Sequence, residues 1–479
     1  MVSLLPSRRI ERSVTAISER DTKAAAGRPL WLSKEIHWDL LRLSVPTVIS
    51  TLAVPLLGIV DTAVLGRLPD VEQLAGAAAG GVILSVVLQM FFFLRMGTTA
   101  LVAQRWGAGD RRGATLVLFQ SMTIAVVFSA ALILLRRPVS VIGFALVGAT
   151  PEVTALGDAY FKIRVLEAPF YLMTLALTAF MRGQGDALVP MYIVIGVNIV
   201  NIVGDLLLVP GTWGIPSFGV VGAAWASVIA QGSGWVAAVL IGWRRVRDYW
   251  DRSWLRRWRQ LPWQRFFAVQ THLFVRTLVL VLTFAAVTSL VARLESATLL
   301  AAHAILMQLW QLVSHGVDGF AFATETMVGM WLGRGDQLRA RASGTAALVW
   351  GLGIGTLFGA AYLLFVDGVA AFFTHNEDVI AVVVSLGWAV ALSQPVNAAA
   401  YVFDGILIGA TDTLYLRNAM LLSTAVFAGI IAAGWLTAGL SLPLIWWALL
   451  VFMAMRAVTL GLRFHSGRWV DMAERAAAS

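Results

Sequence analysis

The chain has 479 residues, of which 59% are apolar and only 13% are charged. Soluble domains carry roughly 25% charged residues, so this composition excludes an ordinary soluble enzyme and predicts a polytopic membrane protein. The absence of cysteine excludes disulfides, thiol catalysis and cysteine metal sites. The six histidines lack metal-ligand spacing, and the sequence has no nucleotide-binding or hydrolase motif. We therefore expect no enzyme, no metal site and no cofactor.

Twelve stretches are long and apolar enough to span a membrane, which takes about 20 residues. After a basic tail (1–37), the first six spans are expected at 40–66, 73–104, 113–135, 156–181, 187–209 and 219–243, forming a first lobe at 38–243. Six more are expected at 265–292, 298–332, 342–366, 379–409, 415–437 and 441–463, forming a second lobe at 265–463, with a tail at 464–479. An Arg- and Trp-rich segment, 244–264, joins the lobes as an amphipathic strap or as a plain solvated linker.

The distribution of positive charge predicts the orientation of the spans. With both termini in the cytoplasm, 28 of the 36 Lys and Arg residues, Arg456 among them, are counted on that side, and six, Arg164 among them, on the outer side. Positive residues are retained on the cytoplasmic side of membrane proteins. The formal charge of +9 is then explained by topology, without nucleic acid as a partner. We expect a multi-pass protein of the plasma or inner membrane.

The two halves repeat at a constant offset of 226 residues. Gly107, Gly109 and Asp110 correspond to Gly333, Gly335 and Asp336, and Pro169, Gly183 and Asp186 correspond to Pro395, Gly409 and Asp412. Six spans per repeat is an even number, so the copies share one orientation and are related by an axis along the membrane normal. The predicted fold is all-α, with twelve helices in two parallel six-helix repeats.

Polar residues inside the first lobe predict a cation-coupling or substrate site. Asp61 lies 19 residues beyond Arg42, and Asp205 lies 19 beyond Asp186, so both are about 28 Å from the inner boundary. Asn198, Asn201 and Asp205 share one helix face. Carboxylates in such a dehydrated pocket are suited to loading and unloading protons. Sodium binding, a static hydrogen-bonded plug and an outer vestibule wall are the alternatives.

The second lobe carries a different set of charges: Arg276, Asp318, Glu325 and Asp404. Charges inside spans are costly and commonly functional. Arg276 has acids at similar depth, as does Arg95 of the first lobe, so the group either contacts substrate or forms an ion-pair network that closes the inner side. Asp404 lies nearer the inner boundary, where we expect it to be solvated. Pro46 removes a backbone hydrogen bond in the first span and bends it, with or without a switching role.

Four segments together resemble the multidrug and toxic compound extrusion (MATE) family. They are Pro46 with the run Pro55 to Gly66, the run Gly97 to Asp110, Arg182-Gly-Gln-Gly-Asp186, and Asn201-Ile-Val-Gly-Asp205. The acid pair of the first half, with Arg276 and Ala301-Ala-His303, is most similar to the DinF-like branch.

The resemblance implies a V-shaped, two-lobe antiporter that exports amphipathic compounds. It also implies that Asp61, Asn201 and Asp205 form a cation site in the first lobe, that the first span bends at Pro46, and that Asp404 matches an acid in span ten. The sodium-coupled branch has an acid in span seven. This chain has none between Arg276 and Arg293, which puts a second-lobe sodium site in doubt.

These observations predict a monomeric exporter of organic, amphipathic compounds that works by alternating access in exchange for protons, with Na⁺ as the alternative ion. Its partners are membrane lipids and a small organic substrate. Dedicated export of one metabolite or organic anion is one alternative. A lipid-linked oligosaccharide flippase is another, and it requires several Arg or Lys residues inside the first-lobe spans. A passive channel is a third, but it needs neither paired acids nor a repeat.

Overall fold

The structure is a computed structural model that describes residues 29–68, 70–214, 216–249, 263–437 and 439–470. Most of the basic tail at 1–37, most of the strap or linker at 244–264, and the last residues of the tail at 464–479 lie outside the described residues. The described part is helical and has no strand.

Twelve helical segments are long and apolar enough to cross a membrane, which confirms the all-α polytopic fold. The first lobe contains α3 (Lys34–Leu65), α4 (Val71–Gln89), α5 (Phe92–Gly107), α6 (Arg111–Leu134), α7 (Arg136–Val147), α8 (Pro151–Arg164), α9 (Ala168–Gly183), α10 (Leu188–Leu208) and α11 (Gly219–Val246). The second lobe contains α13 (Trp263–Ala292), α14 (Ala297–Gly333), α15 (Gln337–Phe373), α16 (Glu377–Gly409), α17 (Thr413–Thr437) and α18 (Leu442–His465). Three short 3₁₀ turns are η1 (Leu30–Leu32), η2 (Val165–Glu167) and η3 (Arg247–Tyr249).

Two expected spans are interrupted, and one helix was not predicted. The second span breaks between α4 and α5, and the fourth is divided into α8, η2 and α9, with Pro169 in the first turn of α9. Proline suits a first turn because its missing N–H has no partner there. Helix α7 has only 12 residues, too few to span a membrane, and it begins with Arg136 and Arg137. In the sequence, these two arginines had indicated a loop between the third and fourth expected spans.

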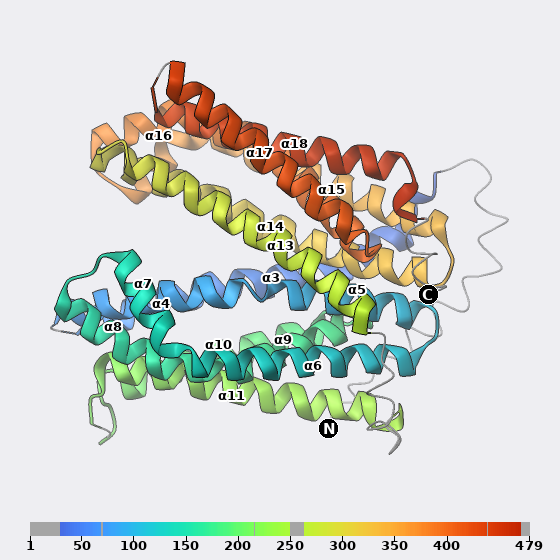
Figure 1. The fold of residues 1–479 in the computed structure, drawn as a ribbon, viewed down its shortest axis with the longest axis horizontal. Helices are drawn as coiled ribbons and strands as arrows, with labels where there is room; N and C mark the ends of the chain where they lie inside the picture. The colour runs from blue at the N-terminus through green and yellow to red at the C-terminus, as the bar shows by residue number, and fades with distance from the viewer. Residues whose placement is uncertain (1–28, 69, 215, 250–262, 438, 471–479) are drawn as a thin grey trace.

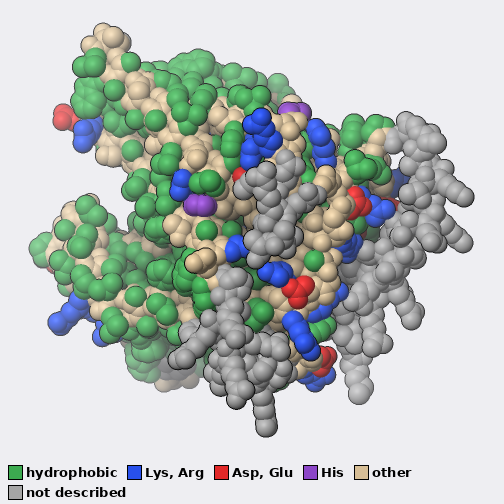
Figure 2. Space-filling view, turned by 45° about the vertical axis from the view of Figure 1, so that its right-hand side comes forward, with side chains coloured by type: hydrophobic (Ala, Val, Ile, Leu, Met, Phe, Trp, Pro, Cys, Tyr) green, Lys and Arg blue, Asp and Glu red, His purple; other side chains and the backbone are tan. Residues whose placement is uncertain are grey.

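The two lobes meet at one end of the molecule and diverge at the other (Figure 1). We call the end where α5 and α14 finish the closed end, and the end that carries α7 the open end. The space-filling view shows a deep indentation between the lobes at the open end (Figure 2). The chain therefore has the V shape that was expected from the repeat and the family resemblance.

Reciprocal glycines bring the lobes together at the closed end. A methyl group added to Gly107 of α5 would overlap the carbonyl oxygen of Met330 in α14, and one added to Gly333 of α14 would overlap the carbonyl oxygen of Gln104 in α5. Residues 104 and 330 are themselves related by the offset of 226. The repeat axis thus passes through this crossing, where helix backbones touch without intervening side chains.

The connections at the closed end repeat as well. Asp110 accepts a hydrogen bond from the backbone N–H of Gly113 at the start of α6 (2.8 Å), and Asp336 accepts one from Arg339 at the start of α15 (2.9 Å). Such caps satisfy backbone donors that a helix start leaves without partners. Asp186 and Asp412, one per lobe, are ion-paired with an arginine at the end of α11 and α18 respectively: Arg245 and Arg463.

The glycine crossing generates a first prediction. Gly333→Ala should destabilise the protein by about 1–3 kcal/mol, the usual cost of overpacking, because a backbone carbonyl cannot move aside as a side chain can. Thermal unfolding followed by tryptophan fluorescence measures this effect. The control is Gly353→Ala in α15, where an added methyl group meets nothing within 4 Å. Equal melting temperatures for the two variants would contradict the tight crossing.

Candidate functional site

The two carboxylates expected to face each other do so inside the first lobe. Asp61 of α3 and Asp205 of α10 lie close enough to interact electrostatically, and one oxygen of each carboxylate is buried without a hydrogen-bond partner among the described residues. Asp205 is 1% exposed and accepts a hydrogen bond from the Asn201 amide at 3.0 Å. The hydroxyl of Ser227 in α11 donates to the Asn201 carbonyl oxygen at 3.4 Å. The amide nitrogen of Asn201 is thereby directed at Asp205.

Two further charged residues belong to this acid site, and sequence reasoning missed both. Arg164 donates to the Glu167 carboxylate at 3.3 Å and also bonds the Tyr160 hydroxyl. Asp61 interacts electrostatically with each of these three side chains. Arg164 had been counted as an outer loop residue. Its spacing of three from Glu167, next to Pro169, was the available signal for a charged pair inside the span.

Asn198 does not join the acid pair. Its amide nitrogen donates to the backbone carbonyl of Ala53 in α3 at 2.7 Å. Asn198 and Asp205 share a face of α10 but lie seven residues, or about two turns, apart. The backbone of α3 is therefore a nearer partner for Asn198 than Asp205 is. Asn198 therefore links α10 to α3, and the acid site consists of Asp61, Asp205, Glu167 and Arg164, with Asn201 as a hydrogen-bond donor.

The matching positions of the second lobe are apolar. At the offset of 226, Asp61, Asn201 and Asp205 correspond to Val287, Phe427 and Ile431, which are all buried. Phe427 and Ile431 form the base of a groove of about 400 Å³ between α13 and α17. The repeat therefore supplies one titratable site and one apolar site at the same level.

A buried ion pair joins the lobes nearer the closed end. Arg95 of α5 lies 3.6 Å from Glu325 of α14, and their side chains are 1% and 0% exposed. The Arg95 guanidinium stacks over the ring of Phe322, 3.6 Å from its centroid. Arg182 at the end of α9 interacts electrostatically with both charges of the pair. The closed end thus holds two first-lobe arginines against one second-lobe glutamate.

Asp404 is not solvated, contrary to expectation. It is 5% exposed, and its Oδ2 atom accepts hydrogen bonds from Arg276 of α13 and Arg456 of α18. Arg456 had been counted with the positive residues of the inner side, although it falls within the expected span 441–463; in the structure it is buried within α18. Asp318 of α14 interacts electrostatically with Arg276 and Asp404. The acid that pairs with Arg276 is therefore Asp404.

Pro46 lies where α3 meets the second lobe. It is buried in α3, and Gly319 of α14 packs against the same turn, where an added methyl group would lie 3.0 Å from the backbone nitrogen of Val48 and 3.1 Å from the carbonyl oxygen of Ser44. The Thr51 hydroxyl also donates to the carbonyl of His315 at 3.1 Å. Any bending of α3 at this proline would therefore displace the contacting turn of α14.

Gln104 links three helices at the closed end. Its amide nitrogen donates to the carbonyl of Gly409 at 2.9 Å and to the hydroxyl of Thr411 at 3.3 Å, and its amide oxygen accepts from Arg265 at 3.2 Å. Thr411 has a φ of 58°, in the left-handed region where the first repeat places Gly185. Non-glycine residues in this region are uncommon. Thr411 therefore forms its hydrogen bond with Gln104 from a strained backbone conformation.

Comparison with known proteins agrees with this arrangement. The sequence model of the MatE family matches residues 46–207 and 273–433, one stretch in each lobe. The chain is 33% identical over 454 residues to DNA damage-inducible protein F of Escherichia coli, covering 90% of this chain and 93% of that protein. It is 28% identical over 453 residues to the probable multidrug resistance protein NorM of Pseudomonas putida, covering 89% and 93% respectively.

Solved structures share the fold. A crystal structure of MATE in the bent conformation superposes with a TM-score of 0.80 at 19% identity, covering 94% of this chain and 98% of that one. An outward-facing multidrug resistance MATE family transporter superposes with a TM-score of 0.78 at 20% identity, covering 91% and 96%.

The Asp404 cluster generates a second prediction. Asp404→Asn leaves two buried guanidinium groups without their carboxylate, and removing one partner of a buried ion pair typically costs about 3–5 kcal/mol. Asp205→Asn keeps an oxygen that accepts from Asn201, so its loss of stability should be much smaller. Thermal unfolding of the two variants in the same detergent makes the comparison. Equal stability would show that Asp404 is not structurally required.

The pair between Arg95 and Glu325 generates a third prediction. Arg95→Met and Glu325→Leu should each destabilise the protein by about 3–5 kcal/mol, because each leaves an unpaired buried charge. The double variant should recover much of this loss, since neither member of the pair is then left without the other, and only Arg182 loses its interaction with Glu325. A double-mutant cycle on the unfolding free energy measures the coupling. Additive effects would exclude a direct interaction across the lobes.

Proposed function

The chain belongs to the MatE family of multidrug and toxic compound efflux transporters, and from this premise we propose that it exports organic amphipathic compounds in exchange for protons by alternating access. The single observation that carries the proposal is the placement of Asp61 near Asp205 inside the first lobe, with a buried oxygen on each carboxylate that has no hydrogen-bond partner among the described residues. Two like charges in a buried site repel strongly, so such a pair holds a proton and releases it when its surroundings change.

The surroundings of the acid pair support an exchange of proton for substrate. Arg164 offsets one of the three nearby carboxylates, Asp61, Asp205 and Glu167, and leaves the site negative when no proton is bound. In the proposed cycle, protonation from the open end lowers the negative charge of the site and displaces substrate. Bending of α3 near Pro46 then carries the change to α14, which packs against that turn.

The charge pattern supports an orientation for this cycle. We place the closed end in the cytoplasm, together with both termini, because its loops carry most of the Lys and Arg residues. The described state then faces outward, with its inner side shut by the glycine crossing and by the pair of Arg95 and Glu325. The protein is proposed to act as a monomer in the cell membrane.

Export of an organic anion is the second candidate, and one observation favours it. Four arginines and three acids lie toward the closed end, all buried except the half-buried Arg182 and Asp318: Arg95, Arg182, Arg276 and Arg456, with Asp318, Glu325 and Asp404. The excess of positive charge would favour an anion once this end opens. A lipid-linked flippase is less favoured, because Arg164 and Arg95 of the first lobe are engaged with Glu167 and Glu325.

The fourth prediction tests proton exchange. In everted membrane vesicles with a preset pH gradient, adding a panel of organic cations and anions should collapse the gradient, with sodium absent as well as present. The Asp205→Asn variant should show at least tenfold less collapse, about 1.4 kcal/mol in the transport step, because the pair loses its titrating group. The charge of the active compounds separates the two candidate functions.

This test has a matched control variant, and specific outcomes would contradict the proposed function. Glu377→Gln removes an exposed carboxylate from the first turn of α16, far from the acid pair, and should leave the collapse unchanged. Wild-type collapse by the Asp61→Asn and Asp205→Asn variants would overturn the role of the pair. A collapse that requires sodium would replace the proton by Na⁺ as the coupling ion.

A further inference from the structure

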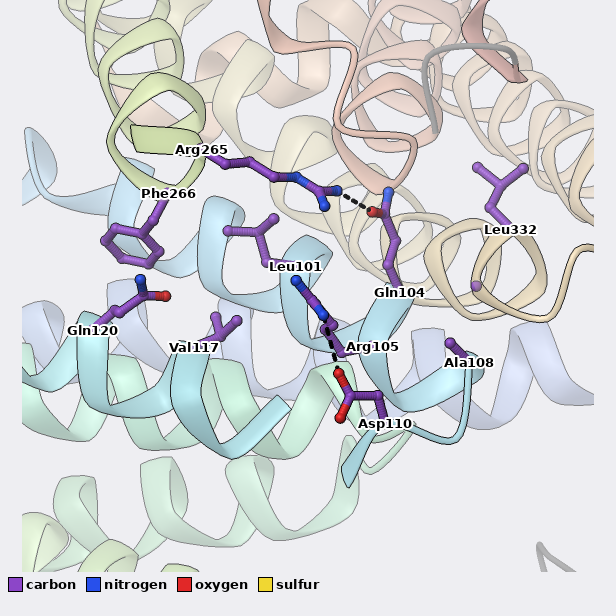
Figure 3. Close-up of a pocket in the computed structure, with 11 residues that line it drawn as sticks. Leu101, Gln104, Arg105, Ala108, Asp110, Val117, Gln120, Arg265, Phe266 and Leu332 are labelled. Carbon is purple, nitrogen blue, oxygen red and sulfur yellow. Dashed lines mark hydrogen bonds and ion pairs between the residues drawn. The ribbon is translucent and has the colours of Figure 1, made fainter. Parts of the chain in front are cut away.

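A pocket of about 120 Å³ lies at the closed end, between the two lobes (Figure 3). Residues of α5, α6, α13 and α14 line it, and they include Arg105, Gln120, Arg265 and Phe266. One water molecule needs roughly 10–15 Å³ of such space, so the pocket has room for several waters or for one small ion. It lies away from Asp61 and Asp205, and the proposed transport cycle assigns it no role.

Two guanidinium groups from opposite lobes extend into this pocket (Figure 3). Arg105 belongs to α5 and Arg265 to α13, and the two charges interact with each other. Arg105 is ion-paired with Asp110 at 3.0 Å, and Arg265 donates to Gln104 at 3.2 Å. The side chains that line the pocket therefore include two arginines, one from each lobe, and one aspartate. Several N–H donors of these arginines face the same small space, which suits an anion placed between the lobes.

The pocket also contains a third donor, the side-chain amide of Gln120. Gln120 of α6 is 2% exposed, and its amide nitrogen has no hydrogen-bond partner among the described residues. A buried donor without an acceptor costs about 1–3 kcal/mol. Phe266, from the first turn of α13, also lines the pocket.

We propose that this pocket binds a small oxyanion, a phosphate group, between Arg105, Arg265 and Gln120. Arginine is suited to this task because its planar fork of donors matches the oxygens of phosphate. The Gln120 amide supplies a donor from a third helix, and Asp110 limits the excess charge of the site. The bound group connects α5 and α6 of the first lobe to α13 of the second lobe, and so holds the closed end shut.

Linkage gives this binding a measurable consequence. A ligand that binds one conformation more tightly than the other increases the population of the first. Phosphate should therefore raise the melting temperature and favour the state in which the open ends lie apart. Neither readout depends on transport, so the site can fail while the proposed export stands, and the reverse also holds.

The test uses the purified full-length chain in an uncharged detergent, titrated with inorganic phosphate against chloride at equal ionic strength. Because the chain has no cysteine, Leu146→Cys and Phe372→Cys place spin labels on exposed sites at the open ends of the two lobes. Phosphate should increase the long-distance population in a saturable manner. Arg265→Gln should weaken the apparent affinity at least tenfold, or about 1.4 kcal/mol.

Two more variants keep the test decisive. Gln120→Leu preserves the volume of the side chain but removes the unpartnered donor, and should weaken phosphate binding severalfold while preserving the fold. Arg112→Gln removes an exposed arginine of the same surface that does not line the pocket, and should bind phosphate as wild type does. If Arg265→Gln does not fold, Arg265→Lys together with Gln120→Leu gives the same comparison.

The phosphate group has two possible sources, and lipid composition separates them. A response to free phosphate in nanodiscs of phosphatidylcholine identifies a soluble oxyanion. A response to phosphatidylglycerol without added phosphate identifies a lipid headgroup, provided that Arg265→Gln abolishes it. The proposal is overturned if the wild type responds to neither source, or if phosphate acts equally on the wild type and on Arg265→Gln.

Discussion

The closed end depends on the close approach of two helix backbones. At Gly107 and Gly333, the backbones of α5 and α14 are in contact. No side chain lies between them that could change rotamer to accommodate a small shift of one helix against the other. Polar groups beside the crossing must therefore find partners on the opposite lobe, as Gln104 and Arg95 do. Packed contacts of this kind switch between discrete arrangements and do not deform continuously. The pair of Arg95 and Glu325, the link through Gln104 and the pocket proposed to bind an oxyanion all lie beside this contact.

The two repeats have kept one backbone while dividing the chemistry between them. Positions occupied by Asp61 and Asp205 in the first lobe hold Val287 and Ile431 in the second. The second lobe does contain an acid, Asp404, but two arginines bind it. A carboxylate fixed in this way is a structural group, whereas no ion pair to Asp61 or Asp205 is found within the described part of the chain. This division gives a physical reason for the proposed coupling through the first lobe.

Much of the fold could be predicted from the sequence, and less of the site. Length and apolarity indicated the twelve spans, and the offset of 226 indicated the two lobes, because these properties are local or periodic. Asp61 and Asp205 could be matched by depth alone. The partners of Asn198, Asp404 and Arg456 could not, because helix rotation decides which neighbour a side chain reaches. Arg164 was misassigned because a charge near a span end reads as a loop residue, although here it lies against Glu167.

The left-handed backbone at Thr411 bears on how the molecule opens. The first repeat has Gly185 at the matching position, where this conformation is relaxed. A side chain in the left-handed region costs of order 1 kcal/mol per residue, and here the hydrogen bond with Gln104 offsets that cost. In the proposed cycle, separation of the lobes at the closed end would break this hydrogen bond and let the loop after α16 relax. Because the first repeat has glycine at the matching position, this strain favours opening on one side of the repeat axis only.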